Sequence, residues 1–158
     1  MNTESESLIL STEFAEYLCN NLDIAIFIVD NSRRIRRAND PFKSLFSLSD
    51  IALLDSLYGD AMKCKLAHRQ NGRCGDAEGC KSCPIQKSIE LALGEGKKTT
   101  VSYIPWELSI DDKLMIKHLQ FVCKPIHFYK PMVIITVHDI TEFEEQKNKS
   151  GNWQIKTF

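Results

Sequence analysis

The pattern of apolar and polar positions divides the first part of the chain into a helix and a hairpin. Apolar residues recur at helical spacing between residues 12 and 20, which predicts an amphipathic helix whose apolar stripe is covered by other groups. The apolar run at residues 24–29 is rich in β-branched residues and stops at a polar Asp-Asn pair, and a second strand resumes at Ile35. These two runs predict a β-hairpin with arginines on its second arm.

The middle of the chain predicts a short helix, then an irregular polar stretch, then a longer helix. Pro41 suits the first turn of a short helix, because its missing amide donor would have been unpaired there. Residues 47–79 are polar and contain several glycines, which predicts small helices and irregular backbone. A helical pattern returns at residues 84–93, and Gly94 and Gly96 are predicted to end it.

The last third of the chain predicts three further strands and one more helix. Segments rich in β-branched residues, at about residues 99–106, 113–126 and 132–139, predict the strands. Thr141 and Glu144 have the spacing of a capping box, in which a carboxylate follows a hydroxyl by three residues. A final helix is therefore predicted to begin at Thr141, and the whole pattern predicts the α+β class.

Composition narrows the possible partners. The chain has 158 residues, of which 43% are hydrophobic, with a formal net charge of -1. This length fits one domain with one core, and the charge gives no global attraction to nucleic acid or anionic membranes.

The four arginines between residues 33 and 37 are interpreted as the solvated face of the hairpin. The acidic N-terminus lacks a secretory signal, and no apolar run approaches the ~20 residues of a spanning helix. We therefore expect a cytoplasmic protein.

Four cysteines within one short stretch form the main chemical candidate. They have the spacing C-x9-C-x5-C-x2-C followed by a proline, and they are Cys64, Cys74, Cys80 and Cys83. Thiolates are soft ligands that select zinc, copper(I) or iron-sulfur clusters. A reducing cytoplasm argues against a disulfide framework, so a metal site explains the clustering. The closing Cys-Pro pair is similar to bacterial ferredoxin runs, although their ligands are more closely spaced. A cluster and a structural zinc ion both remain open at this point.

The remaining thiols and imidazoles are weaker candidates. Cys19 and Cys123 fall in a predicted helix and a predicted strand, and both are expected to be small buried core residues. His68 stands four residues after Cys64, so it is a spare ligand candidate on the same helical face. The other three histidines lie on predicted strands and are expected to pack against neighbours or face solvent.

The order of these elements resembles the PAS sensor fold. Residues 22–30 followed by 35–39 resemble the family's opening hairpin, and residues 137–142 resemble its "DIT" ending, where the sheet leads into an output helix. The resemblance covers about residues 11–145. It implies a five-stranded antiparallel sheet with flanking short helices at 21–140, an N-terminal helix at 1–20, and a C-terminal helix and polar tail at 141–158. The insert at 60–84 resembles that of a cysteine-bearing PAS subgroup found in front of bacterial signalling enzymes.

The resemblance implies a sensory module and not an enzyme. In the PAS fold the cysteine segment would lie at the sensing pocket, which favours an iron-sulfur cluster of the [4Fe-4S] type over an inert Zn²⁺. Such a cluster would respond to redox state, oxygen or nitric oxide. The implied partners are a second copy of the chain and a separate signalling protein such as a histidine kinase or regulator, without direct contact to nucleic acid or membrane.

Two alternatives follow from the same residues. The first is a zinc-stapled PAS module that dimerises or binds a small ligand. Its possible pocket would be lined by Phe27, Phe46, Ile89 and Phe121. The second is a thiol oxidoreductase that uses Cys80 and Cys83, although the strand-helix alternation of the thioredoxin fold is missing.

Overall fold

The centre of the molecule is a curved antiparallel sheet. The computed structural model describes residues 3–49, 53–65, 73–75 and 78–149. Five strands form the sheet, in the order β2-β1-β5-β4-β3. They are β1 (Ala25–Val29), β2 (Ile35–Ala38), β3 (Thr99–Ile110), β4 (Lys113–Phe128) and β5 (Lys130–Asp139). The α+β class and the predicted strands are confirmed.

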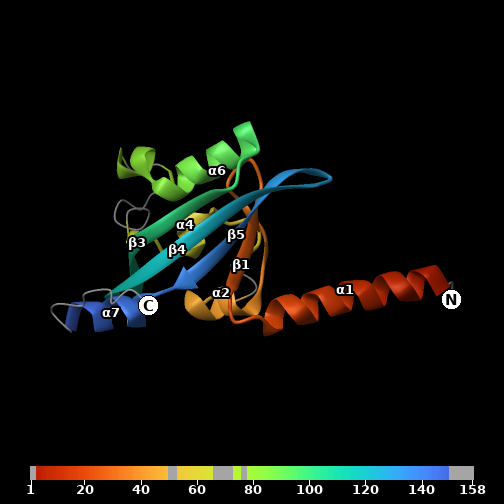
Figure 1. Cartoon of the computed structure of the whole chain (residues 1–158), viewed down its shortest axis with the longest axis horizontal. Helices are drawn as coiled ribbons and strands as arrows, with labels where there is room; N and C mark the ends of the chain where they lie inside the picture. The colour runs from red at the N-terminus through yellow and green to blue at the C-terminus, as the bar shows by residue number, and fades with distance from the viewer. Residues whose placement is uncertain (1–2, 50–52, 66–72, 76–77, 150–158) are drawn as a thin grey trace, which may run out of the picture.

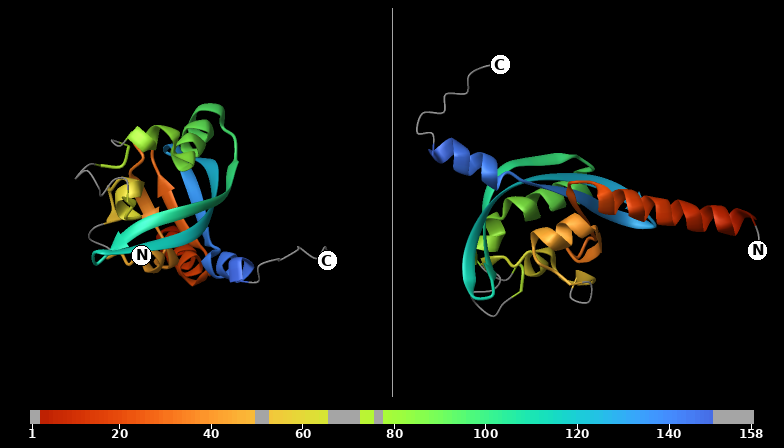
Figure 2. Two further views of the ribbon diagram at one scale, coloured as in Figure 1. Left: turned by 90° about the vertical axis from the view of Figure 1, so that its left-hand side faces the viewer. Right: turned by 90° about the horizontal axis from the view of Figure 1, so that it is seen from below.

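The helices divide into a packed group and two outer helices. The packed group lies on the concave side of the sheet (Figure 2). It comprises α2 (Asp40–Leu45), α4 (Tyr58–Ala61), the 3-10 helix η1 (Glu78–Ser82) and α6 (Pro84–Glu95). The outer helices are α1 (Thr3–Asn21), which projects away from the sheet, and α7 (Thr141–Lys149), which lies beside the lower end of β4 (Figure 1).

Alternating burial explains how the sheet and helices share one core. Along β1 the inward-facing residues Ala25, Phe27 and Val29 are buried. The Phe27 ring lies 4.7 Å from that of Phe42 on α2, measured between ring centroids. On α6, Ile85 and its neighbours at helical spacing face the sheet. Burial of each large apolar side chain contributes roughly 1.5–3 kcal/mol, so this core positions the surrounding elements.

Asn39 connects three elements near the base of α1. Its Oδ1 accepts hydrogen bonds from the Phe42 amide at 3.1 Å and the Ile26 amide at 2.9 Å, capping α2 and binding β1. Its Nδ2 donates to the carbonyl oxygens of Cys19 and Ile24, each at 2.8 Å. A single buried amide therefore fixes the end of α1 against the hairpin.

The structure corrects the prediction for the first helix. Helix α1 spans Thr3–Asn21, close to the N-terminal helix expected at 1–20, but the apolar residues of its second half, where side chains are described, are not covered. Phe14 is 61% exposed and Tyr17 is 64% exposed, because only the last part of α1 meets α2. Cys19, predicted to be buried, is exposed for the same reason. Within the described ranges, no helix has the length and apolar character needed to cross a membrane.

Helix α7 begins at Thr141 as predicted, but the predicted capping box is wrong. The Thr141 hydroxyl accepts a hydrogen bond from the amide of His118 on β4, at 2.9 Å. The Thr141 amide in turn donates to Oδ1 of Asp139 at 3.0 Å. Because the hydroxyl is used by β4, the start of α7 is fixed to the sheet.

The arginine run is exposed in part, as interpreted, but it is also paired. Arg36 and Arg37 lie on β2, and their guanidinium groups bind Asp30 at 2.6 Å and Glu16 at 3.2 Å. Arg34 donates to the carbonyl oxygen of Asp55 at 2.6 Å. The run therefore holds the hairpin to its neighbours, and Arg33, which precedes the strand, points elsewhere.

Candidate functional site

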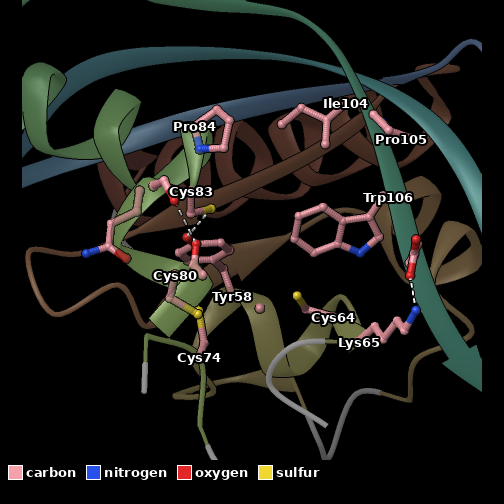
Figure 3. Close-up of a pocket in the computed structure, with 15 residues that line it drawn as sticks. Tyr58, Cys64, Lys65, Cys74, Cys80, Cys83, Pro84, Ile104, Pro105 and Trp106 are labelled. Atoms are coloured by element: carbon pink, nitrogen blue, oxygen red, sulfur yellow. Dashed lines mark hydrogen bonds and ion pairs between the residues drawn. The ribbon is translucent and has the colours of Figure 1, made fainter. Parts of the chain in front are cut away.

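The four clustered cysteines meet at one cavity. Cys64, Cys74, Cys80 and Cys83 all line a space of about 420 Å³ between the packed helices and β3. Figure 3 shows three of them beside Tyr58, while Cys64 lies across the space towards the indole of Trp106. The sequence prediction that these four residues belong together is consistent with this arrangement, although their role as ligands stays a prediction.

The short helix α4 places the first two cysteines. The Cys64 amide donates to the carbonyl oxygen of Gly59 at 2.9 Å, and Cys64 also forms an isolated bridge with Leu108 on β3. The Cys74 amide donates to Oδ1 of Asp60 at 2.8 Å. Gly59 lies between them, since a Cβ there would stand 2.6 Å from the Cys74 sulfur and 3.8 Å from the Cys64 Cβ. A glycine at this position lets Cys74 approach α4.

The other two cysteines flank the start of α6. Cys80 lies in η1 and is 7% exposed. Its carbonyl oxygen accepts a hydrogen bond from the Cys83 amide at 3.1 Å. Cys83 immediately precedes α6, whose first residue is Pro84, and the Cys83 sulfur lies 3.6 Å from the Tyr58 hydroxyl. The predicted helix start at Pro84 thus turns the chain so that Cys83 faces the cavity.

Burial controls the protonation of the groups at the cavity wall. Burial raises the pKa of the Cys74 thiol to about 11, although a backbone hydrogen bond from Gly59 and the charge of Arg33 oppose this shift. The pKa of Tyr58 is also raised, first by burial and then by the nearby thiols of Cys83 and Cys74. At neutral pH Cys74 is therefore a neutral thiol and Tyr58 a neutral hydroxyl that can donate a hydrogen bond to sulfur.

The opposite wall is formed by β3. Trp106 is 6% exposed, and its Nε1 donates to the carbonyl oxygen of Met62 at 3.0 Å. Lys65 and Glu107, which both line the cavity, form an ion pair. The wall therefore holds the Trp106 ring by burial and one hydrogen bond, and it is charged near Lys65.

The donor set fits a metal centre in its chemistry, but the sulfurs do not surround a single point. Across the ranges that the structure describes, no three His, Cys, Asp or Glu side chains are arranged to hold one metal ion. Tetrahedral zinc at 2.3 Å from each thiolate requires sulfurs about 3.8 Å apart. The cavity that the four thiols line has a volume of about 420 Å³.

The other residues singled out by the sequence lie elsewhere. Cys123 is fully buried in β4, as predicted, and His68 lies outside the described residues. The four residues predicted as a possible ligand pocket are fully buried, or 1% exposed in one case, and none of them lines the cysteine cavity: Phe27, Phe46, Ile89 and Phe121. In the structure these side chains form part of the apolar core.

Sequence reasoning missed three groups at the site. Tyr58 and Trp106 line the same cavity as the thiols, and the Arg33 guanidinium, from the β1–β2 turn, lies against Gly75, the residue after Cys74. Trp106 falls at the end of a predicted strand, and alternation along that strand carries no information about a cavity. Arg33 has φ 62°, a conformation usual for glycine or asparagine, so the sequence contained no signal of its position.

Several solved structures share this fold. A PAS domain of an HTR-like protein from Haloarcula marismortui is 14% identical, with 87% of this chain and 98% of that chain covered and a TM-score of 0.58. A PAS domain of a Colwellia psychrerythraea protein is 16% identical, with 83% and 98% covered and a TM-score of 0.57. A PAS domain from a two-component sensor histidine kinase is 13% identical, with 82% and 96% covered and a TM-score of 0.57.

These similarities define the class of fold. No protein-family model matches the sequence, and no curated protein matches it significantly. The structural neighbours, by contrast, are covered almost end to end by this chain. The chain therefore has the PAS fold, which confirms the resemblance seen in the order of its elements.

Proposed function

We propose that this chain is a sensory module in which Cys64, Cys74, Cys80 and Cys83 hold an iron-sulfur cluster, and that the module responds to redox state, oxygen or nitric oxide. One observation carries the proposal: four thiols from separate segments line one cavity inside a PAS fold. Four cysteine thiolates are the usual ligand set of such clusters. The proposal describes a receiver of signals and not an enzyme.

The size of the cavity favours a cluster over one zinc ion. A single ion draws four sulfurs to about 3.8 Å from one another, as tetrahedral geometry requires. A cluster contains several metal and sulfide atoms, so its ligands stand farther apart. A space of about 420 Å³ between thiols that are not gathered around one point supports the larger group.

The chain's own residues would tune this site. A bound cluster supplies one-electron chemistry whose potential depends on hydrogen bonds to sulfur and on exposure to solvent. Tyr58 is positioned to donate its hydroxyl proton to the Cys83 sulfur. The indole of Trp106 and the Pro84 ring cover apolar parts of the wall. These groups limit solvent near the thiols and stabilise the thiolate form of at least one ligand.

The sheet offers a direct route from the cavity to α7. Pro105 lines the cavity and pairs in register with His118 on β4. The His118 amide binds the Thr141 hydroxyl, and the His118 carbonyl oxygen accepts from the Ile140 amide at 2.8 Å. Ligation of Cys64 and Cys83 would also hold β3 to the start of α6. Loss of that link would shift the packing of the helices on the sheet, and the start of α7 would follow β4.

The outer helices supply candidate contacts with partners. Helix α1 exposes Phe14, Tyr17 and Leu18 on its projecting length, and α7 exposes Phe143. Apolar faces of this kind bury readily against another helix. We propose that they form a homodimer and that the dimer acts on a separate signalling protein, since one neighbour of the same fold belongs to a histidine kinase.

Anaerobic purification followed by metal and sulfide analysis tests the proposal. We expect iron and acid-labile sulfide in near-equal amounts, lost on Cys83→Ser and retained on the control Cys19→Ser, because Cys19 is exposed on α1 away from the cavity. If the protein contained zinc but no sulfide, the cluster proposal would be wrong and the zinc-stapled module would be supported. A metal-free protein that catalytically reduces disulfides would contradict both metal readings and support the thiol oxidoreductase.

A further inference from the structure

One short segment of the chain crosses the concave side of the sheet from one edge to the other (Figure 2). At its start it pairs with the β2 edge, through an isolated bridge between Leu57 and Arg34, the residue before β2. At its end it pairs with the β3 edge, through a second bridge between Cys64 and Leu108. Strands β2 and β3 are the two outer strands of the sheet. We call residues 55–64, which include α4, the strap.

Backbone hydrogen bonds attach the strap to the start of β2. The Ile35 amide donates to the Ser56 carbonyl oxygen at 2.8 Å, and the Asp55 amide donates to the Ile35 carbonyl oxygen at 3.0 Å. The Tyr58 amide, at the start of α4, donates to the Arg33 carbonyl oxygen at 3.2 Å. Because these bonds join main chain to main chain, a displacement of α4 acts directly on the backbone of β2.

The strap also forms a wall of the cysteine cavity. Gly59 and Cys64 both line the cavity, and the Met62 carbonyl oxygen accepts a hydrogen bond from Nε1 of Trp106 at 3.0 Å. A Cβ at Gly59 would stand 2.6 Å from the Cys74 sulfur, so α4 and this thiol are in close contact. Since closely packed groups transmit displacement to one another, a change in the position of the thiols also displaces the strap.

The other end of β2 holds α1. Asn39 follows β2 directly, and its Nδ2 donates to the Cys19 carbonyl oxygen at 2.8 Å. Arg37 on β2 pairs with Glu16 on α1 at 3.2 Å. Strand β2 has 4 residues, which span about 13 Å at roughly 3.3 Å per residue. One short strand therefore joins the strap at one end to α1 at the other.

We infer that the strap couples the state of the cysteine cavity to the direction in which α1 projects. The link depends on the proposed function only in that the cavity is taken as the sensing site, and it is separate from the route through β3 and β4 to α7. Displacement passes from the thiols to α4, from α4 to β2, and from β2 to the base of α1. Both ends of this link are held by the hydrogen bonds described above.

The length of α1 amplifies a small change at its base. Helix α1 has 19 residues, or about 28 Å at 1.5 Å per residue, so a rotation of about 10° at its base moves its far end by roughly 5 Å. The exposed apolar residues Phe14, Tyr17 and Leu18 lie on this helix. A rotation of that size changes which apolar groups of two α1 helices meet in the proposed dimer.

Gly59→Ala in the metal-free protein tests the link without any occupant. The added methyl group would lie 2.6 Å from the Cys74 sulfur and 2.9 Å from its Cβ, so α4 or Cys74 must move. We expect the amide NMR signals of β2 and of residues 16–22 to shift several times more than in the control. Gly94→Ala is the matched control, because an added methyl group there meets nothing within 4 Å. Amides at the tip of the β4–β5 hairpin, residues 126–132, should stay in place.

Trp106→Phe perturbs the other end of the strap. It removes the hydrogen bond to the Met62 carbonyl oxygen and keeps an aromatic ring, so it should shift the same α1 signals even if Gly59→Ala does not fold. Unchanged signals at residues 16–22 in the folded variants would overturn the link. Equal shifts at the β4–β5 tip would also overturn it, because they would show a general loosening of the fold.

The cluster-bearing protein separates the link from the proposed function. We expect the signals of residues 16–22 to differ between the cluster-bearing and the metal-free protein. If Gly59→Ala shifts these signals in a protein that never holds iron and sulfide, the link stands and the proposed cluster is wrong. If the protein holds the cluster but α1 gives identical signals with and without it, the cluster stands and the link is wrong.

Discussion

The carboxylate of Asp30, in the β1–β2 turn, and the cysteine cavity are built in opposite ways. Asp30, which is 2% exposed, accepts hydrogen bonds from the amides of Ser32 at 2.8 Å and Arg34 at 3.1 Å. It also pairs with Arg36 at 2.6 Å. The chain itself completes this carboxylate site. The cysteine cavity instead places four thiols around a space of about 420 Å³ that the chain does not fill.

The difference separates a site that stabilises the fold from one that is suited to receive a ligand. A buried carboxylate with all its partners supplied by the chain contributes to stability, and removing it leaves charged and polar groups unpaired. Thiols around a space can be altered with smaller losses, because neutral sulfur has weak hydrogen bonds to lose. Substitutions at Asp30 should therefore reduce stability more than ligand binding, and substitutions at the cavity should do the reverse.

Asp30→Asn should have the largest effect on stability. We expect the free energy of unfolding in urea to fall by about 2–3 kcal/mol, because Arg36 loses its buried partner and two amides lose a charged acceptor. Asp55→Asn is the control, since Asp55 also binds Arg36 but is 69% exposed, and its loss should stay below about 1 kcal/mol. Equal losses for both variants would contradict the distinction.

The contribution of Asp30 should also depend on pH. Burial raises its pKa, but the hydrogen bonds from Arg34, Arg36 and Ser32 outweigh burial, so the pKa lies below its usual value of 3.8. Its stabilisation is therefore fully present above that value and is lost as pH falls through the lower pKa of the folded state. The difference in unfolding free energy between the unmodified protein and Asp30→Asn should shrink in that acidic range and stay constant between pH 6 and 7, as urea titrations at several pH values can show.

Two single alanine variants, Cys123→Ala and Cys83→Ala, should differ in opposite directions in the free energy of unfolding and in iron content. Cys123→Ala removes a fully buried sulfur from β4, so we expect a loss of about 1–2 kcal/mol with the iron retained. Cys83→Ala lies at the partly exposed cavity wall and should cost less than about 1 kcal/mol in the metal-free protein. The iron content should fall only for Cys83→Ala. Urea unfolding and metal analysis of the same preparations measure both effects.

Tyr58→Phe should have the smallest effect on folding. The ring remains in place and one hydroxyl contact with the Cys83 sulfur is lost, so the free energy of unfolding should fall by about 1 kcal/mol or less. Tyr17→Phe, on an exposed part of α1, provides the baseline. A loss above about 3 kcal/mol for Tyr58→Phe would mean that the cavity wall is as important to the fold as the Asp30 site.

Much of the fold could be predicted because its signals are local. The β1–β2 hairpin follows from a β-branched run and its polar turn, and α6 follows from Pro84 at its start and a glycine at its end. Gly96 indeed has φ 65°, and its amide binds the Ala92 carbonyl oxygen at 3.1 Å. Gly94, which was also predicted to end the helix, lies inside α6. Residues that start and end helices and strands in this way act through local backbone geometry. The sequence alone was therefore sufficient to predict these elements.

The failed predictions depend on tertiary contacts. The capping box at Thr141 satisfied a local rule, yet the hydroxyl binds the His118 amide across the sheet. Cys19 was predicted to be buried because cysteine is among the most buried residue types, but α1 projects from the domain. At the site, spacing grouped the four cysteines, whereas Arg33 lies against Gly75, beside Cys74, from a turn more than thirty residues earlier in the chain. No pattern of spacing could connect it to Cys74.

The indole of Trp106 gives this domain a built-in optical probe. Its ring forms part of the cavity wall, and its Nε1 is held by Met62, so the fluorophore has a fixed orientation towards whatever occupies the space. Coloured occupants that absorb in the near ultraviolet would shorten its excited-state lifetime by energy transfer. The chain contains one other tryptophan, Trp153, and a Trp153→Phe variant would leave a single emitter. The filling and emptying of the site could then be timed in solution without any label.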